Sequence, residues 1–212
     1  MKEQLIDSCM AVLVALIAAS VVMIVHELSK ALAYKCYIHI YNKKYDKMVI
    51  CPDILKLHRY IDPVGLILAI TNYGLFSKQY PFIIKSKKAS FLIGIIGYIS
   101  LGIVLVLAIF GYKTYFSHDI TLGKDQMLQY YLIKACKYFL EYVAYFSIML
   151  LMANLYPIAT FDISLIIASI SPFAYVKIRK FDLFYKLVFL LLVSIGVFFT
   201  AGIYLTSKCL GF

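Results

Sequence analysis

The sequence predicts a membrane protein that is mostly α-helical: a polytopic bundle of about four to six membrane elements, with a broken helix and a short membrane-associated β-hairpin. Hydrophobic residues make up 63% of the 212 positions and charged residues only 15%, whereas charged residues supply about a quarter of an ordinary soluble domain. The mean hydropathy is +0.87. Apolar runs of bilayer-crossing length alternate with short polar segments, and no internal repeat is visible. We therefore expect one integral membrane domain over residues 1–212.

The first half of the chain predicts a long helix followed by strands. Residues 8–34 are apolar and lack Pro and Gly, which predicts the first membrane helix. Residues 35–60 are rich in Tyr, Ile and Val around a polar turn, so we predict a hairpin with strands at 37–41 and 48–50.

The middle of the chain predicts one clear span. Residues 61–77 are apolar but short and interrupted by Pro, Gly and Asn, which favours a re-entrant or shielded segment. Residues 89–112 predict a spanning helix, and 113–137 a polar loop or surface helix. Three glycines of the span are available for close helix contact: Gly94, Gly97 and Gly102.

The last third predicts a broken helix and a final span. Residues 138–175 are mostly apolar but contain a helix-breaking Pro with polar residues on either side. We predict a helix, an unwound turn and a second helical piece there, since such breaks at membrane depth need protein or water around them. Residues 177–180 predict a basic turn, and 183–206 the last span.

The distribution of basic residues predicts the orientation. Fourteen of the 21 Lys and Arg residues lie in 35–60, 78–88 and 177–186, and the side richer in Lys and Arg is cytoplasmic. This places the N-terminus outside and the end of the first helix toward the cytoplasm. Abundant Ile, Lys and Tyr with no Trp hint at AT-rich coding, which favours a bacterial cell membrane.

Composition also argues against two other classes. The net charge of +10 does not indicate a nucleic-acid partner, because the basic residues lie between apolar runs and no nucleic-acid-binding or phosphate-binding motif is present. The five cysteines are widely spaced and form no C-x-x-C pair. Neither a disulfide framework nor a thiolate zinc site is therefore predicted.

One polar motif interrupts the first helix. His26-Glu27-Leu28-Ser29-Lys30 puts His26 and Lys30 one turn apart on one face, with Glu27 beside them. This is the geometry of H-E-x-x-H, in which two His ligands hold zinc and the Glu acts as base on the bound water. Lys30 stands at the second ligand position. Asp162, at the predicted helix break, adds an intramembrane carboxylate suited to be a third ligand.

These motifs, in this order, resemble the site-2 protease family of membrane-embedded zinc metallopeptidases over most of the chain. The family's zinc-ligand helix is similar to 26–30, and its Asn-x-x-Pro-x-x-x-x-Asp segment to 154–162. Its Asp-Pro-x-Gly segment is similar to 62–65, and its Gly-x-x-Lys-Pro loop to 74–81.

The resemblance implies a role for each motif residue. His26 and Asp162 would be zinc ligands, Glu27 the general base, and Asn154 a polar group near the substrate or the oxyanion. The implied partner is a transmembrane protein substrate in the lipid bilayer, cleaved near the cytoplasmic face. Four positions depart from the family pattern, in which His, Pro, Asn and Gly are usual: Lys30, Tyr98, Leu101 and Ile163.

Three hypotheses stay open at this point. The first is a zinc-dependent intramembrane endopeptidase. In the second, the chain is a non-catalytic relative that binds a membrane partner, and a Lys30 ammonium pairs with Glu27 and Asp162 without metal. The third, a small transporter or channel, is disfavoured because no inverted repeat is present. Three histidines are candidates to replace the missing ligand, although each is expected to be interfacial: His39, His58 and His118.

Overall fold

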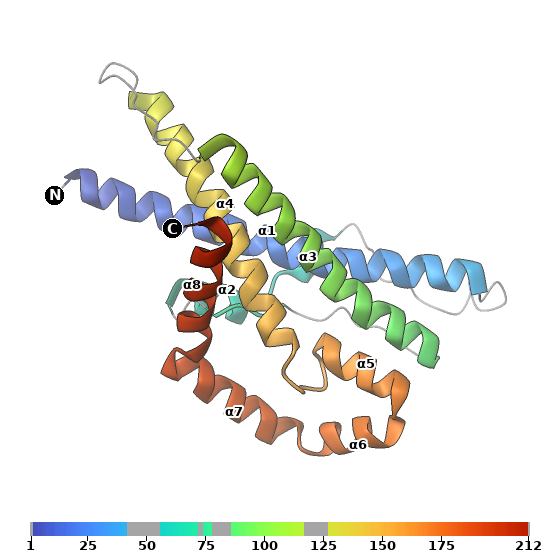
Figure 1. Cartoon of the computed structure of the whole chain (residues 1–212). Coiled ribbons are helices and arrows are strands. Elements are labelled where there is room, and N and C mark those ends of the chain that lie inside the picture. The colour runs from blue at the N-terminus through green and yellow to red at the C-terminus, as the bar shows by residue number, and fades with distance from the viewer. Residues whose placement is uncertain (1, 42–55, 72–73, 78–85, 117–126, 212) are drawn as a thin grey trace.

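The computed structural model describes residues 2–41, 56–71, 74–77, 86–116 and 127–211, and this part of the chain is helical with no strand. Three long helices dominate: α1 (Lys2–Tyr41), α3 (Lys87–Phe116) and α4 (Met127–Asn154). Figure 1 shows α3 and α4 side by side with α1 crossing them, and several of the shorter helices beyond the C-terminal end of α4. The shorter elements are η1 (Leu57–Tyr60), α2 (Pro63–Thr71), α5 (Asp162–Ile170), α6 (Pro172–Lys180), α7 (Asp182–Ile195) and α8 (Val197–Leu210).

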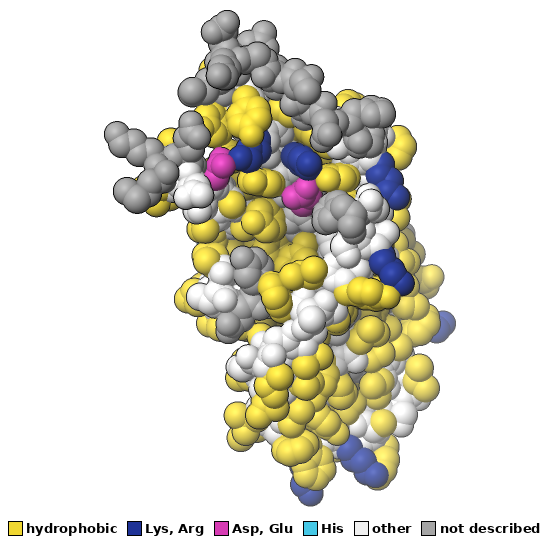
Figure 2. Space-filling view, turned by 60° about the vertical axis from the view of Figure 1, so that its left-hand side comes forward, with side chains coloured by type: hydrophobic (Ala, Val, Ile, Leu, Met, Phe, Trp, Pro, Cys, Tyr) yellow, Lys and Arg dark blue, Asp and Glu magenta, His cyan; other side chains and the backbone are white. Residues whose placement is uncertain are grey.

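Three of these helices are long and apolar enough to cross a membrane: Gln4–Tyr41, Lys87–Phe116 and Leu128–Asn154. The pair α7 and α8 passes the same test together, as a fourth element bent by 61°. Hydrophobic side chains cover most of the face drawn in Figure 2. Length and composition therefore support an integral membrane protein, with three or four spans among the described residues.

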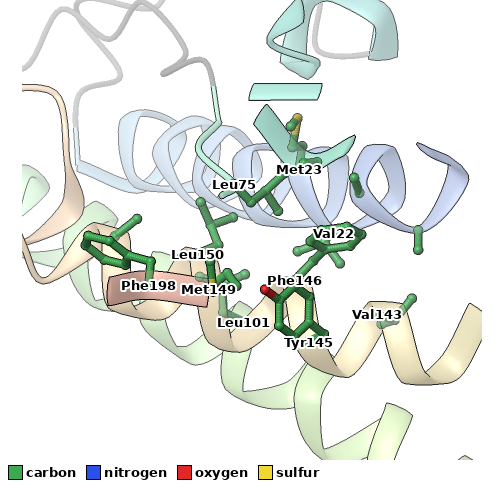
Figure 3. Packing of buried hydrophobic residues seen from close by; sticks show 14 of the residues in the cluster. Val22, Met23, Leu75, Leu101, Val143, Tyr145, Phe146, Met149, Leu150 and Phe198 are labelled. Atoms are coloured by element: carbon green, nitrogen blue, oxygen red, sulfur yellow. The ribbon is translucent and has the colours of Figure 1, made fainter. Parts of the chain in front are cut away.

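The core lies between α1, α3 and α4. Small residues of α1, Ala18 and Ala19, are fully buried and let the helices approach closely. Larger side chains fill the rest of the core, and Figure 3 shows Val22 of α1 near Phe146 of α4, while Met23 points away from Phe146 toward Leu75 and the neighbouring short helix. This packing fixes α1 against the other two long helices. It thereby sets the position of every polar group that α1 carries.

The predicted β-hairpin is wrong in its first half. Residues 37–41 continue α1 as helix, and 48–50 lie outside the described residues. The alternation of aromatic and β-branched side chains is overridden by packing, since β-propensity depends strongly on tertiary context. Tyr34 and Ile38, one helical turn apart, are buried against Ile93 and Leu165. The strand-like sequence thus forms the last turns of a helix whose buried face matches its neighbours.

Other predicted boundaries also change. Residues 127–137, predicted as loop or surface helix, are the first three turns of α4, and 177–180 are helical as the end of α6. The last span is divided at Gly196, whose φ of +83° ends α7 in the left-handed region that glycine adopts readily. The helix predicted over 89–112 is confirmed as α3, which is long and apolar enough to span a membrane, and the predicted break after Asn154 is also confirmed.

The short helix α2 begins with a side-chain cap. Asp62 Oδ1 accepts hydrogen bonds from the backbone N–H groups of Val64 (2.9 Å) and Gly65 (3.3 Å), and Pro63 occupies the first helical position. At nine residues α2 is too short to cross a bilayer. A Cβ on Gly65 would collide with the Phe76 carbonyl, so the glycine lets the segment 74–77 pass close by.

The piece that follows the break, α5, packs antiparallel on the first half of α3. Ser90 Oγ donates to the Leu165 carbonyl at 2.7 Å, and a Cβ on Gly94 would lie 2.9 Å from the Asp162 carbonyl oxygen. Small residues on α3 therefore admit α5 at short distance, as the glycine spacing predicts. Gly102 is different, because nothing lies within 4 Å of its Cβ position. The start of α5 is thereby held against α1 and α3.

Candidate functional site

The polar residues of the sequence motifs meet in one buried cluster. His26, Glu27 and Lys30 come from α1, Asn154 from the end of α4, and Asp162 from the start of α5. All five side chains are at most 3% exposed. Charged groups buried to this extent are stable only when they are paired and hydrogen-bonded. We name these five residues the polar cluster.

Lys30 joins the two carboxylates of the cluster. Its Nζ donates to Glu27 Oε1 at 2.7 Å and to Asp162 Oδ1 at 2.9 Å. Both are short charge-assisted hydrogen bonds. One ammonium thus links two acidic groups that are distant in the sequence, and it ties α1 to α5.

The orientation of the His26 ring is fixed by a hydrogen bond from Nδ1 to the backbone of α3. Its Nδ1 lies 3.2 Å from the Gly97 carbonyl oxygen, and since a carbonyl only accepts, Nδ1 carries a proton. Nε2 then faces Asp162 Oδ2 at 3.2 Å, Asn154 Nδ2 at 3.3 Å and Glu27 Oε1 at 3.6 Å. Through this one ring, α1 contacts α3 at Gly97, the end of α4 at Asn154 and the start of α5 at Asp162.

Gly97 is required for this arrangement. A Cβ at this position would lie 2.6 Å from Asp162 Cγ and closer still to Oδ2. Any side chain here would displace the carboxylate from His26 and Lys30. Gly97 was predicted to permit close helix contact, and the structure gives it a second role beside the polar cluster.

Three supporting residues were not predicted as part of the site. Ser77 Oγ donates to Glu27 Oε1 at 2.7 Å, and Tyr98 Oη donates to the Asn154 carbonyl at 2.6 Å, where α4 ends. Tyr60 is buried over α1 with Ala31. Burial and the nearby Glu27 carboxylate raise the pKa of Tyr60, so its hydroxyl keeps its proton. Tyr98 had been noted only as a departure from the family pattern, and Ser77 lies in the segment 74–81 that is similar to a family loop, although no role was predicted for it.

The geometry of the polar cluster can be compared with that of a tetrahedral zinc site. Two ligands bound at about 2.0–2.1 Å in a tetrahedral site lie about 3.3 Å apart, and His26 Nε2 and Asp162 Oδ2 are separated by 3.2 Å. The third position is Lys30, whose ammonium has no lone pair while it donates to both carboxylates. Its positive charge would also repel a metal cation. The residues as arranged therefore supply two zinc ligands and do not fit a complete zinc site.

The other histidines do not complete the set. His39 and His58 are exposed, at the end of α1 and in η1 respectively, so neither belongs to the buried cluster. His118 lies outside the described residues. No group of three or more His, Cys, Asp or Glu among the residues that the structure describes is placed to hold a metal ion.

Comparisons with known proteins identify no relative of this chain. No family model matches the chain, and neither a curated protein nor a solved structure matches it. The resemblance to site-2 proteases therefore rests on the motifs alone.

Proposed function

We propose that this protein is a membrane-embedded, non-catalytic relative of the site-2 proteases, which binds a transmembrane partner without zinc. The observation that carries the proposal is the position of Lys30 Nζ, 2.7 Å from Glu27 and 2.9 Å from Asp162. The ammonium stands where the family's second histidine ligand would be, and it supplies positive charge to the same carboxylates.

Glu27 is also poorly arranged to act as a base. Its Oε1 already accepts hydrogen bonds from Lys30 and from Ser77, and the side chain is 1% exposed. A general base must come within hydrogen-bond reach of the proton that it removes. The contacts around Glu27 favour a structural role, in which the polar cluster locks α1, α4 and α5 together.

The partner-binding part of the proposal rests on the motif resemblance and on the surface beside α1. The short helix α2 packs on α1 through Gly65, next to Met23, and turns Val64 and Ile67 outward. A nine-residue apolar helix can present these side chains to a neighbouring transmembrane helix without itself spanning the bilayer. A partner that docks on α2 would lie near the polar cluster, because Gly65 of α2 packs against Phe76 and the adjacent Ser77 donates a hydrogen bond to Glu27.

A second candidate function is a zinc-dependent intramembrane peptidase. The 3.2 Å separation of His26 Nε2 and Asp162 Oδ2 favours it, because this is a suitable spacing for two ligands of one metal ion. It requires Lys30 to lose its proton and release both carboxylates. Metal affinity at neutral pH then carries the free-energy cost of that deprotonation.

Zinc content per chain separates the two candidates. We expect little zinc in the native detergent-purified protein and about one zinc in Lys30→His, which restores H-E-x-x-H on the same helix face. Adding Asp162→Asn to Lys30→His should remove that zinc. Ser29→His is the matched control, since it adds a histidine at the neighbouring position on a different face. About one zinc in the native chain, lost in Asp162→Asn, would support the peptidase instead.

Site-specific photo-crosslinking in cells tests partner binding. A crosslinking amino acid at Ile67 of α2 should give a discrete product with another membrane protein, and the product should persist in Glu27→Gln. The control position is Phe110, an exposed residue on the distant half of α3. Products that are the same at both positions, or only lipid adducts, would contradict docking on α2.

A further inference from the structure

The end of α6 lies where two membrane segments end. The backbone N–H of Ala159, in the turn after α4, donates to Asp182 Oδ1 at 2.8 Å. The candidate span of α4 ends at Asn154, and the bent candidate span begins at Asp182. This hydrogen bond therefore brings two span boundaries to the same level. Figure 1 shows α6 leading directly into α7 at this point.

The last turn of α6 carries positive charge that no described acidic group neutralises. Lys177, Arg179 and Lys180 are all exposed, and none forms an ion pair with a described residue. Asp182, the next acidic residue along the chain, is already engaged: Oδ2 pairs with Lys186 at 2.6 Å. The three cations are therefore available to an anionic ligand.

Aromatic side chains lie beside these cations. Phe173 is 71% exposed and Phe181 is 52% exposed. Lys177 Nζ lies 4.8 Å from the centre of the Phe173 ring, and Lys180 Nζ lies 5.9 Å from that of Phe181. Exposed rings beside basic groups at a span boundary are typical of contact with both the acyl and the headgroup regions of a lipid.

We propose that this basic turn binds the headgroup of an anionic phospholipid. The phosphate would accept hydrogen bonds from Arg179 and the two lysines, while Phe173 and Phe181 contact the upper acyl chain. A lipid fits better than an acidic protein segment, because the rings next to the cations are strongly exposed and the turn lies at the end of two apolar spans. Lipid supplies both the anion and the apolar surface.

The test compares two lipids that share acyl chains and differ in headgroup charge. Detergent-purified protein is titrated with dioleoylphosphatidylglycerol or with dioleoylphosphatidylcholine, and bound lipid is counted by native mass spectrometry. The native chain should prefer the anionic lipid. Arg179→Gln/Lys180→Gln should weaken that binding about tenfold to thirtyfold, since each basic residue near the surface contributes about fivefold.

Matched variants distinguish a site from general charge attraction. Lys113→Gln/Lys208→Gln removes the same charge from exposed residues at the far ends of α3 and α8 and should leave binding unchanged. Arg179→Lys/Lys180→Arg retains the charge and should retain binding. Equal losses in both glutamine pairs, or no headgroup preference in the native chain, would overturn the proposal; the second result would leave an acidic protein as the ligand. Displacement by an equal concentration of free glycerol phosphate would also overturn it, because the rings would then contribute nothing.

Discussion

Lys30 Nζ on the first helix lies 2.9 Å from Asp162 Oδ1 at the start of α5, although 132 positions separate the two residues. The contact connects α1 to the helical piece that follows the break after α4. Both side chains are buried, so the pair is not weakened by water as a surface salt bridge would be. It follows that each partner depends on the other.

Removing the ammonium should destabilise the fold strongly. Lys30→Met keeps the length of the side chain but leaves Glu27 and Asp162 without their shared cation, and breaking a buried ion pair costs about 3–5 kcal/mol. The free energy of unfolding can be measured by titration with denaturing detergent. The double variant Lys30→Met/Asp162→Asn should lose at least about 1 kcal/mol less than the sum of the two single losses. Strictly additive losses would show that the two residues do not interact.

A methyl group at Gly97 should disrupt the cluster. In Gly97→Ala the new Cβ would lie 2.6 Å from Asp162 Cγ, so we expect a loss of about 1–3 kcal/mol from overpacking. Gly102→Ala is the matched control on the same helix, because nothing lies within 4 Å of its Cβ position. That variant should be unchanged, or more stable by up to about 1 kcal/mol. Equal effects in the two variants would contradict the close approach of Asp162 to α3.

The hydroxyl of Tyr98 should stabilise the end of α4. Tyr98→Phe removes its hydrogen bond to the Asn154 carbonyl, and we expect a loss of about 0.5–1.5 kcal/mol in the free energy of unfolding. Tyr115→Phe, at an exposed position on the same helix, should have little effect. A native-like Tyr98→Phe variant would argue that the carbonyl finds another donor.

The cap of α2 can be tested by hydrogen exchange. Asp62→Ala removes the acceptor for the Val64 and Gly65 amides, so both should exchange faster, with a loss of about 0.5–2 kcal/mol. Asp62→Asn keeps an oxygen that can accept and should remain close to native. If the alanine and asparagine variants exchanged alike, the cap would not hold α2.

The helical elements follow largely from local sequence. The apolar run of α3 and the break between Asn154 and Asp162 are predictable, since long apolar runs and Pro-containing breaks are local features. The hairpin prediction failed at Tyr37–Tyr41 because alternation of apolar residues cannot reveal that Tyr34 and Ile38 pack on α3 and α5. The bend at Gly196 is hard to predict, because an isolated glycine in an apolar run is often tolerated within a helix.

The sequence motifs predict only some of the residues and contacts of the site. Helical periodicity alone places His26, Glu27 and Lys30 together. The family resemblance added Asn154 and Asp162 to the same site, although they come from a distant part of the chain. The hydrogen bonds from Ser77 and to the Gly97 carbonyl depend on how separate segments pack. Backbone carbonyls and single hydroxyls leave no recognisable sequence pattern, so these contacts could not be predicted.

The position of any metal tests the central claim most directly. Crystals of the native protein grown with zinc, and measured at the zinc absorption edge, should show no anomalous peak between His26 Nε2 and Asp162 Oδ2, with Lys30 Nζ bound to both carboxylates. Crystals of Lys30→His under the same conditions should show a peak there. A peak at that position in the native protein, with Lys30 turned away from Glu27 and Asp162, would contradict the account.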